Sequence, residues 1–306
     1  MRLKGGSSVP KVIVISGPTA SGKTDFSLRL AQKIDGEIIS ADSLQVYKGL
    51  DIGTAKVTIP EQLDFVHYGL DLVYPDNNYS VADFQIMARK AITEIIAKGK
   101  TPIIVGGTGL YIQSTLFDYE FLPNEQVLEL QRYDNFSTDT LVNKLRNLDA
   151  LALAKIGENN RRRIIHAIAL AEQTNLTKTQ REQKQEQKLL YDILPFAIVP
   201  ERVALYERIN LRVDRMLKQG LIAEIEYFAN HFELCTSVKT AIGYREPLAY
   251  LQGNYDNYQS MVADLKQNTR RFAKRQITWI RNQKIAYDLI DTTDFEQVLA
   301  AVDKFI

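Results

Sequence analysis

The stretch Gly17–Thr24 reads GPTASGKT and stands between an apolar run, KVIVIS at residues 11–16, and an amphipathic run that begins at Asp25. Its glycines and lysine have the spacing G-x-x-x-x-G-K-[ST], and a strand before it with a helix after it is the context that this motif requires. In such a loop the backbone N–H groups form a concave anion site, to which the helix N-terminus and the lysine add positive charge. The stretch therefore predicts a phosphate-binding loop (P-loop).

The composition is that of a soluble globular protein, with 306 residues of which 45% are hydrophobic and 25% charged. Because no run of about 18 apolar residues occurs, we expect no membrane span. Residues 1–10 lack the apolar core of a secretory signal, so we expect a flexible leader there and a cytoplasmic location. A single cysteine excludes an internal disulfide, and three scattered histidines give no zinc-site spacing.

Apolar runs alternate with helix-length segments in the first third of the chain. Residues 11–16, 37–40 and 101–107 are β-branched and bounded by glycine or proline, as buried parallel strands are. Between the last two, residues 80–99 have apolar side chains every three or four positions, which predicts a helix capped by Ser80. This alternation predicts an α/β fold, with a P-loop NTPase-like parallel sheet flanked by helices.

The pattern changes after about residue 113. Residues 139–157 and 161–175 have helical periodicity, and the polar tract 178–190 indicates a solvated helix or a mobile loop. An apolar extended stretch returns at 191–200, followed by a predicted helix over 202–220. We therefore expect a core formed by residues 11–115 and 191–306, interrupted by an all-helical insertion at 116–190.

Two polar residues follow predicted strands and should lie at the ligand-binding edge of the sheet. Asp42 could be a Mg²⁺-binding acid, a base or hydrogen-bond acceptor for a nucleophile, or a plain turn cap. Thr108, in the turn GGTGLY, could hydrogen-bond a substrate or leaving-group oxygen, although a structural turn explains its glycines equally well. The later apolar runs do not end on an acid as those of ATP-using P-loop proteins usually do, which is weak evidence against ATP chemistry.

Basic residues are segregated in three places. Residues 266–284 contain seven Lys or Arg and no acid, and Arg161–Arg163 form a second cluster. Such runs fit contact with an RNA or DNA backbone, and a solvated face or a pyrophosphate clamp remains an alternative. Arg208, Arg212 and Arg215 recur along one helix face, where they could bind a polyphosphate or form surface ion pairs with Glu207 or Asp214.

Eight segments together resemble the bacterial tRNA dimethylallyltransferases, also called tRNA isopentenyltransferases. They run in the family's order from about residue 11 to 285 and read GPTASGKT, DSLQVYKGLDIGTAK, YSVADF, VGGTGLY, RRRIIHAI, YERINLRVDRML, AIGYRE and RRFAKRQITWIRN. Each segment is weak evidence alone, whereas eight in order are highly specific.

The resemblance implies transfer of the dimethylallyl group of dimethylallyl diphosphate to N6 of adenosine 37 in tRNAs that read codons beginning with U. The P-loop would then hold an isoprenoid diphosphate instead of ATP. It also implies Mg²⁺ as cofactor, and we expect a monomer that binds the anticodon stem-loop, with the helical insertion contacting the anticodon arm.

The resemblance assigns roles residue by residue. Asp42 would orient the adenine amine and take its proton, with Thr108 and Lys23 as further catalytic residues and Thr24 as the metal-binding one. The residues implied to bind diphosphate are Gly17, Thr19, Ala20, Ser21, Gly22, Lys23, Thr24, Arg208 and Arg212. The residues implied to bind tRNA are Asp42, Ser43, Leu44, Gln45, Thr108, Arg162, Arg163, His166, Lys239, Gly243, Tyr244, Arg245, Arg271, Lys274 and Arg275.

The sequence departs from the family's pattern in several places. His166 stands where an arginine is usual and Ala169 where a glutamate is frequent, so an RNA contact at His166 would be weaker and pH-sensitive. The stretch after Pro123 is shorter than usual, and the C-terminal zinc finger of eukaryotic members is absent. The alternatives are a P-loop kinase of a small metabolite, an adenylate isopentenyltransferase that uses free nucleotide, and a non-catalytic RNA-binding module.

Overall fold

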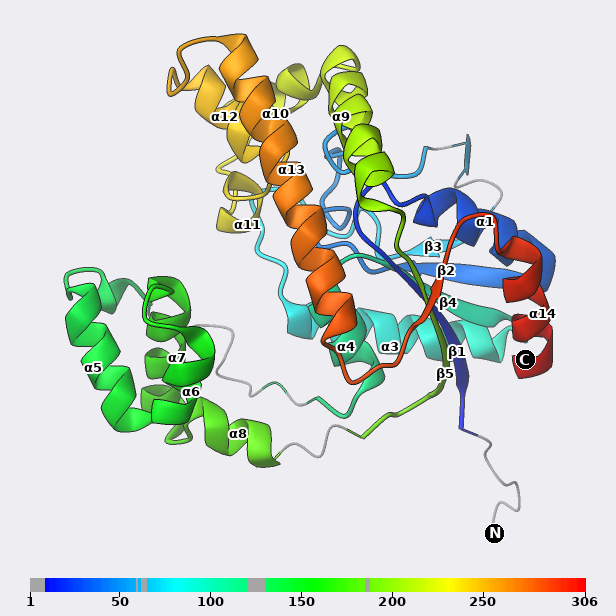
Figure 1. Ribbon diagram of the computed structural model, residues 1–306, viewed down its shortest axis with the longest axis horizontal. Helices are drawn as coiled ribbons and strands as arrows, with labels where there is room; N and C mark the ends of the chain where they lie inside the picture. The colour runs from blue at the N-terminus through cyan, green and yellow to red at the C-terminus, as the bar shows by residue number, and fades with distance from the viewer. Residues whose placement is uncertain (1–8, 59, 62–64, 120, 122–129, 185–187) are drawn as a thin grey trace. The chain divides into compact units, whose positions relative to one another are not determined.

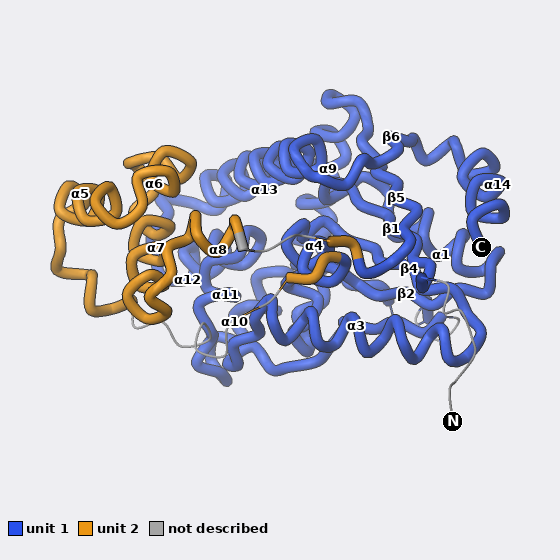
Figure 2. Tube along the Cα trace, turned by 90° about the horizontal axis from the view of Figure 1, so that it is seen from below, with its two compact units in different colours: residues 1–116, 190–306 blue, residues 117–189 orange. Residues whose placement is uncertain are grey.

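The computed structural model describes residues 9–58, 60–61, 65–119, 121, 130–184 and 188–306. The chain forms two compact units, one of residues 1–116 with 190–306 and one of residues 117–189 (Figure 2). The second unit lies within the insertion expected at 116–190. Most of the expected leader, residues 1–8, and the short stretch after Pro123 lie outside the described residues.

The first unit contains a parallel sheet of six strands in the order β3-β2-β4-β1-β5-β6 (Figure 1). Their bounds are Lys11–Ser16 (β1), Gly36–Ser40 (β2), His67–Tyr68 (β3), Thr101–Gly106 (β4), Asp192–Ile198 (β5) and Asp288–Ile290 (β6). The strands predicted at 11–16, 37–40, 101–107 and 191–200 are thus confirmed, whereas the short strands β3 and β6 were not predicted. In register, Ser16 pairs with both Gly106 and Ala197, so the central strands end level at one edge.

Helices cover both faces of this sheet (Figure 1). Helices α1 (Lys23–Ile34) and α14 (Phe295–Phe305) lie on one face, where Ile13 and Ile15 of β1 pack against them. Helices α3 (Val81–Ala97) and α4 (Gly109–Leu116) lie on the other. Because successive side chains of a strand point to opposite faces, a strand covered on both sides is apolar throughout, as β1 is. The capping box of Ser80 and Asp83 confirms the predicted start of α3.

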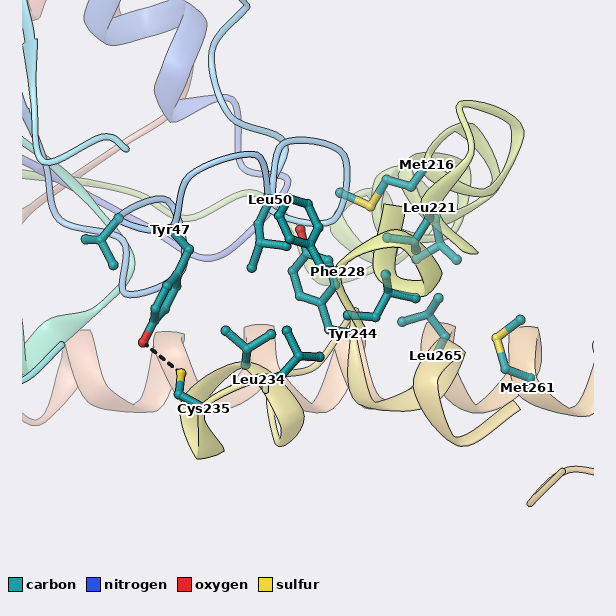
Figure 3. Packing of buried hydrophobic residues seen from close by; sticks show 14 residues of the cluster. Tyr47, Leu50, Met216, Leu221, Phe228, Leu234, Cys235, Tyr244, Met261 and Leu265 are labelled. Atoms are coloured by element: carbon teal, nitrogen blue, oxygen red, sulfur yellow. Dashed lines mark hydrogen bonds between the residues drawn. The ribbon is translucent and has the colours of Figure 1, made fainter. Parts of the chain in front are cut away.

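A further helical layer follows β5. It consists of α9 (Arg202–Lys218), α10 (Leu221–His231), α11 (Thr236–Lys239), α12 (Arg245–Leu251) and α13 (Tyr258–Arg281), and α9 and α13 lie side by side (Figures 1 and 2). Their apolar side chains share a core with Tyr47 and Leu50 of the segment after β2 (Figure 3). Although α13 spans 24 residues, no helix within the described ranges is long and apolar enough to cross a membrane.

The second unit, in its described part, has only helices besides one isolated bridge. These are η1 (Leu130–Tyr133), α5 (Thr138–Leu148), α6 (Ala150–Ile156), α7 (Arg161–Thr174) and α8 (Lys178–Lys184). The helical periodicity of residues 139–157 is confirmed, although the stretch forms two helices because Asp149 divides it. Its backbone is extended, with φ −158°, and its side chain accepts a hydrogen bond from Ala152 N at 2.9 Å to cap α6.

The sheet core should be far less tolerant than the outer face of α3. Replacing Ile103, which is fully buried in β4, by alanine should lower the unfolding free energy by about 2–5 kcal/mol, because a cavity remains. The same change at Ile86, which is 67% exposed on α3, should stay within about 0.5 kcal/mol. Urea unfolding measures both, and equal midpoints for the two variants would contradict this assignment of the core.

Candidate active site

A pocket of about 150 Å³ lies in the first unit, where the ends of the central strands meet α9 and α13. Its lining comes from the P-loop, the segment after β2, the turn after β4 and the facing sides of the two helices. This is the edge at which parallel α/β sheets bind ligands, because the loops that follow the level strand ends converge there.

The P-loop turns tightly between β1 and α1. A Cβ at Gly17 would lie 2.5 Å from the carbonyl oxygen of Ile198, so only glycine fits there. Ala20 and Gly22 have φ of 62° and 92°, which brings the chain round to start α1 at Lys23. The hydroxyl of Ser21 is buried and, in the described part of the chain, has no hydrogen-bond partner. Together with the free N–H groups of the first turn of α1, it favours a bound anion.

Lys23 reaches back over this loop, and its ammonium donates to Pro18 O at 2.7 Å. The pKa of Lys23 is lowered to about 7, mainly because the ammonium is removed from bulk water and also because Arg212 is positively charged, while the negative charge of Asp42 opposes both effects. A polyphosphate in the pocket would supply the missing negative charge. The loop is thus electrostatically incomplete without an anion.

Asp42 lies directly after β2 and lines the pocket. Its Oδ1 accepts a hydrogen bond from Leu44 N at 2.9 Å, so the turn-cap role proposed from the sequence is real for one oxygen. Its other oxygen has no hydrogen-bond partner among the described residues. One carboxylate therefore both caps the turn and offers an acceptor to a ligand.

Thr108 is held beside Asp42. Its backbone N–H donates to Ala41 O at 3.1 Å, and its Oγ1 accepts from Ser43 N at 3.1 Å. The neighbouring glycines have a packing reason, since a Cβ at Gly106 would lie 2.2 Å from Ala41 O and one at Gly109 would lie 2.0 Å from the ring of Trp279. The turn is therefore structural in its glycines, while it places the threonine hydroxyl in the pocket.

The three arginines predicted on one face of α9 differ in their surroundings. Arg212 lines the pocket, donates to Thr54 O at 3.4 Å, and has its pKa lowered by burial and raised by Asp42. Arg208 lies one turn earlier, is exposed and does not line the pocket, so its position lends no support to the prediction that it binds diphosphate. Arg215 is also exposed, and the ion pair considered with Asp214 is formed instead by Lys266, at 2.7 Å.

Tyr244 requires a correction. The family resemblance implied an RNA contact, but its side chain is fully buried in the core shared with α10 (Figure 3). Its hydroxyl donates to Glu224 at 2.8 Å. Its ring packs against Gly53, where an added Cβ would lie only 2.4 Å from the nearest ring atom. Tyr244 therefore supports the loop behind the pocket and cannot reach RNA.

Glu224 was missed by sequence reasoning. Its carboxylate accepts three backbone hydrogen bonds, from Asp51 N at 2.9 Å, Ile52 N at 2.8 Å and Gly53 N at 3.1 Å. These bonds hold the pocket wall that includes Gly53. In sequence, Glu224 is one acid on an amphipathic helix, and nothing local marks it.

The other residues implied to bind tRNA fall into three groups. Ser43, Leu44, Gln45 and Gly243 line the pocket, and Gln45 accepts from Ser40 at 2.8 Å. Arg245 is half-buried and ion-paired with Glu246 at 2.7 Å. Exposed cationic positions on the first unit are Lys239, Arg271, Lys274 and Arg275, and exposed positions on α7 of the second unit are Arg162, Arg163 and His166.

His166 has an electrostatic setting of its own within the second unit. Partial removal from water lowers its pKa, and the neighbouring positive charges of Arg162, Lys178 and Arg181 lower it further. At neutral pH its imidazole is therefore mainly uncharged.

The donor set for a metal is small. The described residues contain no group of three or more His, Cys, Asp or Glu that could hold an ion. Thr24 lines the pocket at the start of α1, and its hydroxyl with phosphate oxygens and water forms the kind of set that Mg²⁺ accepts. The residues present thus fit a Mg²⁺ that is carried mostly by the bound phosphates.

The pocket also has an apolar side, formed by Ile209, Val213 and Met216 of α9 and by Leu265 and Phe272 of α13. An anion loop and a hydrophobic wall in one pocket suit a ligand that is polyphosphate at one end and hydrocarbon at the other.

The model of the IPP transferase family matches residues 45–283, which is more than half of the chain. The chain belongs to this family. The resemblance drawn from the eight segments is thereby confirmed.

Relatives that match nearly the full length of this chain support its assignment to the family. The chain is 44% identical over 292 residues to a tRNA dimethylallyltransferase of Anoxybacillus flavithermus, covering 94% of this chain and 93% of the relative. A tRNA isopentenylpyrophosphate transferase structure from Staphylococcus epidermidis is 40% identical, with a TM-score of 0.70 and coverage of 96% and 98%. A structure of a eukaryotic dimethylallyltransferase acting on tRNA is 29% identical, with a TM-score of 0.79 and coverage of 96% and 77%.

The pKa of Lys23 gives a direct test of this pocket. In ¹³C-lysine NMR, Lys23 should titrate near pH 7 in the free protein, and Arg212→Gln should raise the midpoint while Asp42→Asn lowers it. Added diphosphate should also raise it, because a nearby anion favours the charged ammonium. Binding then takes up a proton above pH 7, so this group weakens affinity by up to about tenfold per pH unit as the pH rises. A titration midpoint of Lys23 that changes neither in the two variants nor on addition of diphosphate would contradict the proximity of Lys23 to Arg212, Asp42 and the anion site.

Proposed function

We propose that this protein transfers the dimethylallyl group from dimethylallyl diphosphate to N6 of adenosine 37 in tRNAs that read UNN codons. The products are N6-(dimethylallyl)adenosine in the tRNA and free diphosphate. The observation that carries the proposal is that Lys23, Arg212 and Asp42 share one pocket with an apolar wall, close enough for the charge of Asp42 to act on both cations. The names of the relatives support the same reaction.

The donor's diphosphate binds at the P-loop. The N–H groups at the start of α1, the Ser21 hydroxyl and the ammonium of Lys23 hold its oxygens, and Arg212 approaches from α9. The Thr24 hydroxyl would hold Mg²⁺, which would supply further neutralisation of the leaving group's charge. As the bond between C1 and the diphosphate oxygen breaks, these positive groups stabilise the developing charge.

The acceptor amine is oriented on the other side of the pocket. The free oxygen of Asp42 accepts a hydrogen bond from the exocyclic N6, and the Thr108 hydroxyl lies next to it. A bond forms between N6 and C1 of the dimethylallyl group, and Asp42 accepts the proton that N6 loses. Diphosphate leaves with the electron pair of the broken C–O bond.

The RNA is bound by exposed cations. Arg271, Lys274 and Arg275 of α13 form no ion pair with any described residue, which leaves them available to phosphates. In the second unit, the cations Arg162 and Arg163 lie exposed on α7 together with the mainly uncharged His166, and we assign this unit to the anticodon arm. The target adenosine must leave its stack to enter the pocket, as for other enzymes that act on a base. A cytoplasmic monomer is part of the proposal.

A P-loop kinase is the second candidate, and one contact argues against it. The acid that follows the apolar run at β5 is Glu201, and its side chain accepts from Val203 N at 2.7 Å and Ala204 N at 3.2 Å to cap α9. Glu201 thus caps α9 and is not among the residues that line the pocket with Lys23 and Thr24, which argues against a role as the metal-holding acid that ATP-using relatives of the fold carry.

The first test is transfer of label from dimethylallyl diphosphate to unmodified tRNA that carries A36-A37-A38, with Mg²⁺ present. Wild type should prenylate the tRNA without ATP turnover. An asparagine at position 42 can still accept the hydrogen bond from Leu44 N, but it cannot take a proton from N6. The prenylation rate of Asp42→Asn should therefore fall by about 10²-fold or more.

Asp303→Asn, on the exposed side of α14, is the matched control and should retain the wild-type rate. Full activity in Asp42→Asn would contradict the base role while leaving the function intact. ATP consumption without prenylation would instead favour the kinase.

The RNA surface is tested by charge. Replacing Arg271, Lys274 and Arg275 together by alanine should weaken tRNA binding and reduce the slope of log K against log salt by about one for each phosphate that is no longer neutralised. A matched triple, Lys33, Lys90 and Lys304 to alanine, removes the same charge from helices α1, α3 and α14. Filter binding over a salt series distinguishes them, and equal slopes for both triples would contradict the assignment of α13.

A further inference from the structure

Gln276 is a buried polar residue that links two loops of the pocket. It lies on α13 and is only 8% exposed. Its Oε1 accepts a hydrogen bond from Thr19 N at 2.9 Å, and its Nε2 donates to Gly107 O at 3.1 Å. Thr19 belongs to the P-loop and Gly107 to the turn after β4, so one side-chain amide bridges the two.

The two hydrogen bonds of Gln276 lie just beyond the last backbone pair between β1 and β4, where the sheet no longer links the P-loop to the turn after β4. β1 and β4 are in register up to the pair Ser16–Gly106, and beyond it the P-loop and the turn leave the ladder. A glutamine amide has the donor and acceptor of a peptide group, so Gln276 acts as one more rung of the ladder. The absence of a side chain at Gly107 fits this, because a Cβ there would lie 2.2 Å from Nε2 of Gln276.

The bridge connects the groups on both sides of the reaction. On one side, Thr19 is four residues before Lys23 in the loop for the leaving diphosphate. On the other side, Thr108 follows Gly107 and is bonded to Ala41 and Ser43, the residues that flank Asp42. A line of hydrogen bonds thus runs from the diphosphate loop to the segment that carries the base.

We propose that Gln276 is a positioning residue for group transfer, one that sets the spacing between the leaving-group loop and the Asp42–Thr108 pair. This inference rests on the function proposed above. Gln276 also lines the pocket, and because its amide oxygen and one N–H are engaged by backbone, the proposed effect is exerted through Thr19 and Gly107. Transfer between two bound substrates is sensitive to such spacing, because a misplacement of about 1 Å can cost about 10²-fold in rate.

The test uses three substitutions of the full chain. Gln276→Met keeps the size but loses both bonds, and should lower kcat/KM for dimethylallyl diphosphate by about 10- to 100-fold without weakening tRNA binding. Gln276→Glu keeps the acceptor for Thr19 N but, when ionised, sets a carboxylate oxygen against Gly107 O. Gln267→Met, at an exposed position of the same helix, is the control and should match wild type.

The pH profile separates positioning from a merely structural role. A protonated glutamate can donate to Gly107 O, and burial raises its pKa above the usual value of about 4.3. The ratio of kcat/KM in Gln276→Glu to that in wild type should therefore rise as the pH falls from 8 toward 5. A ratio that is constant with pH would overturn the proposal, as would wild-type kcat/KM in Gln276→Met.

Binding of inorganic diphosphate keeps this test separate from the reaction itself. Calorimetry should show weaker diphosphate binding in Gln276→Met and unchanged binding in Gln267→Met. If wild type binds diphosphate but prenylates no tRNA, the proposed function fails, and the loss or retention of diphosphate binding still decides whether Gln276 positions the loop. If Gln276→Met does not fold, the pH dependence of Gln276→Glu decides.

Discussion

The parallel pairing of β1 with its neighbours is the constraint on which the site depends. Because Ser16 is level with Gly106 and with Ala197, three chain segments leave the sheet at one height. Bare backbone is needed where they crowd together, as at Gly17 against Ile198 O and at Gly106 against Ala41 O. Gly17, the first glycine of the phosphate-binding motif, thus satisfies the geometry of the sheet edge as well as the ligand.

Burial of positive charge beside one carboxylate is the second condition. Lys23 and Arg212 are both held out of bulk water, which disfavours their charged forms, and the nearby Asp42 only partly offsets this. A site with this imbalance is selective for polyanions, because an anion recovers the electrostatic free energy that the cations lose on burial. The same Asp42 is oriented by Leu44 N, so its free oxygen faces the pocket with little freedom.

The helical layer after β5 acts as scaffold as well as lining. Glu224 binds three consecutive backbone amides of the segment after β2, and Tyr244 packs against Gly53 in the same place. From α13, Gln276 joins the P-loop to the turn that carries Thr108. These contacts come from residues more than 150 positions away in the chain, which explains why the loops can be rigid although they are polar and irregular.

Periodicity and motif spacing were sufficient for the parallel sheet, for a helix after the P-loop, for the start of the next long helix at Ser80, and for placing Asp42 and Thr108 at one edge, because these features depend on neighbours in sequence. The division of residues 139–157 at Asp149 and the short strands β3 and β6 were not predictable in this way, since they depend on contacts elsewhere in the fold. The sequence by itself determined the P-loop, its strand and helix, and the family. Only the tertiary structure decided that Arg212 and not Arg208 lines the pocket, that Tyr244 is core, and that Glu224 and Gln276 hold the loops. The physical reason is that burial and hydrogen-bond partners depend on which distant segment packs against a side chain, and sequence spacing carries no record of that.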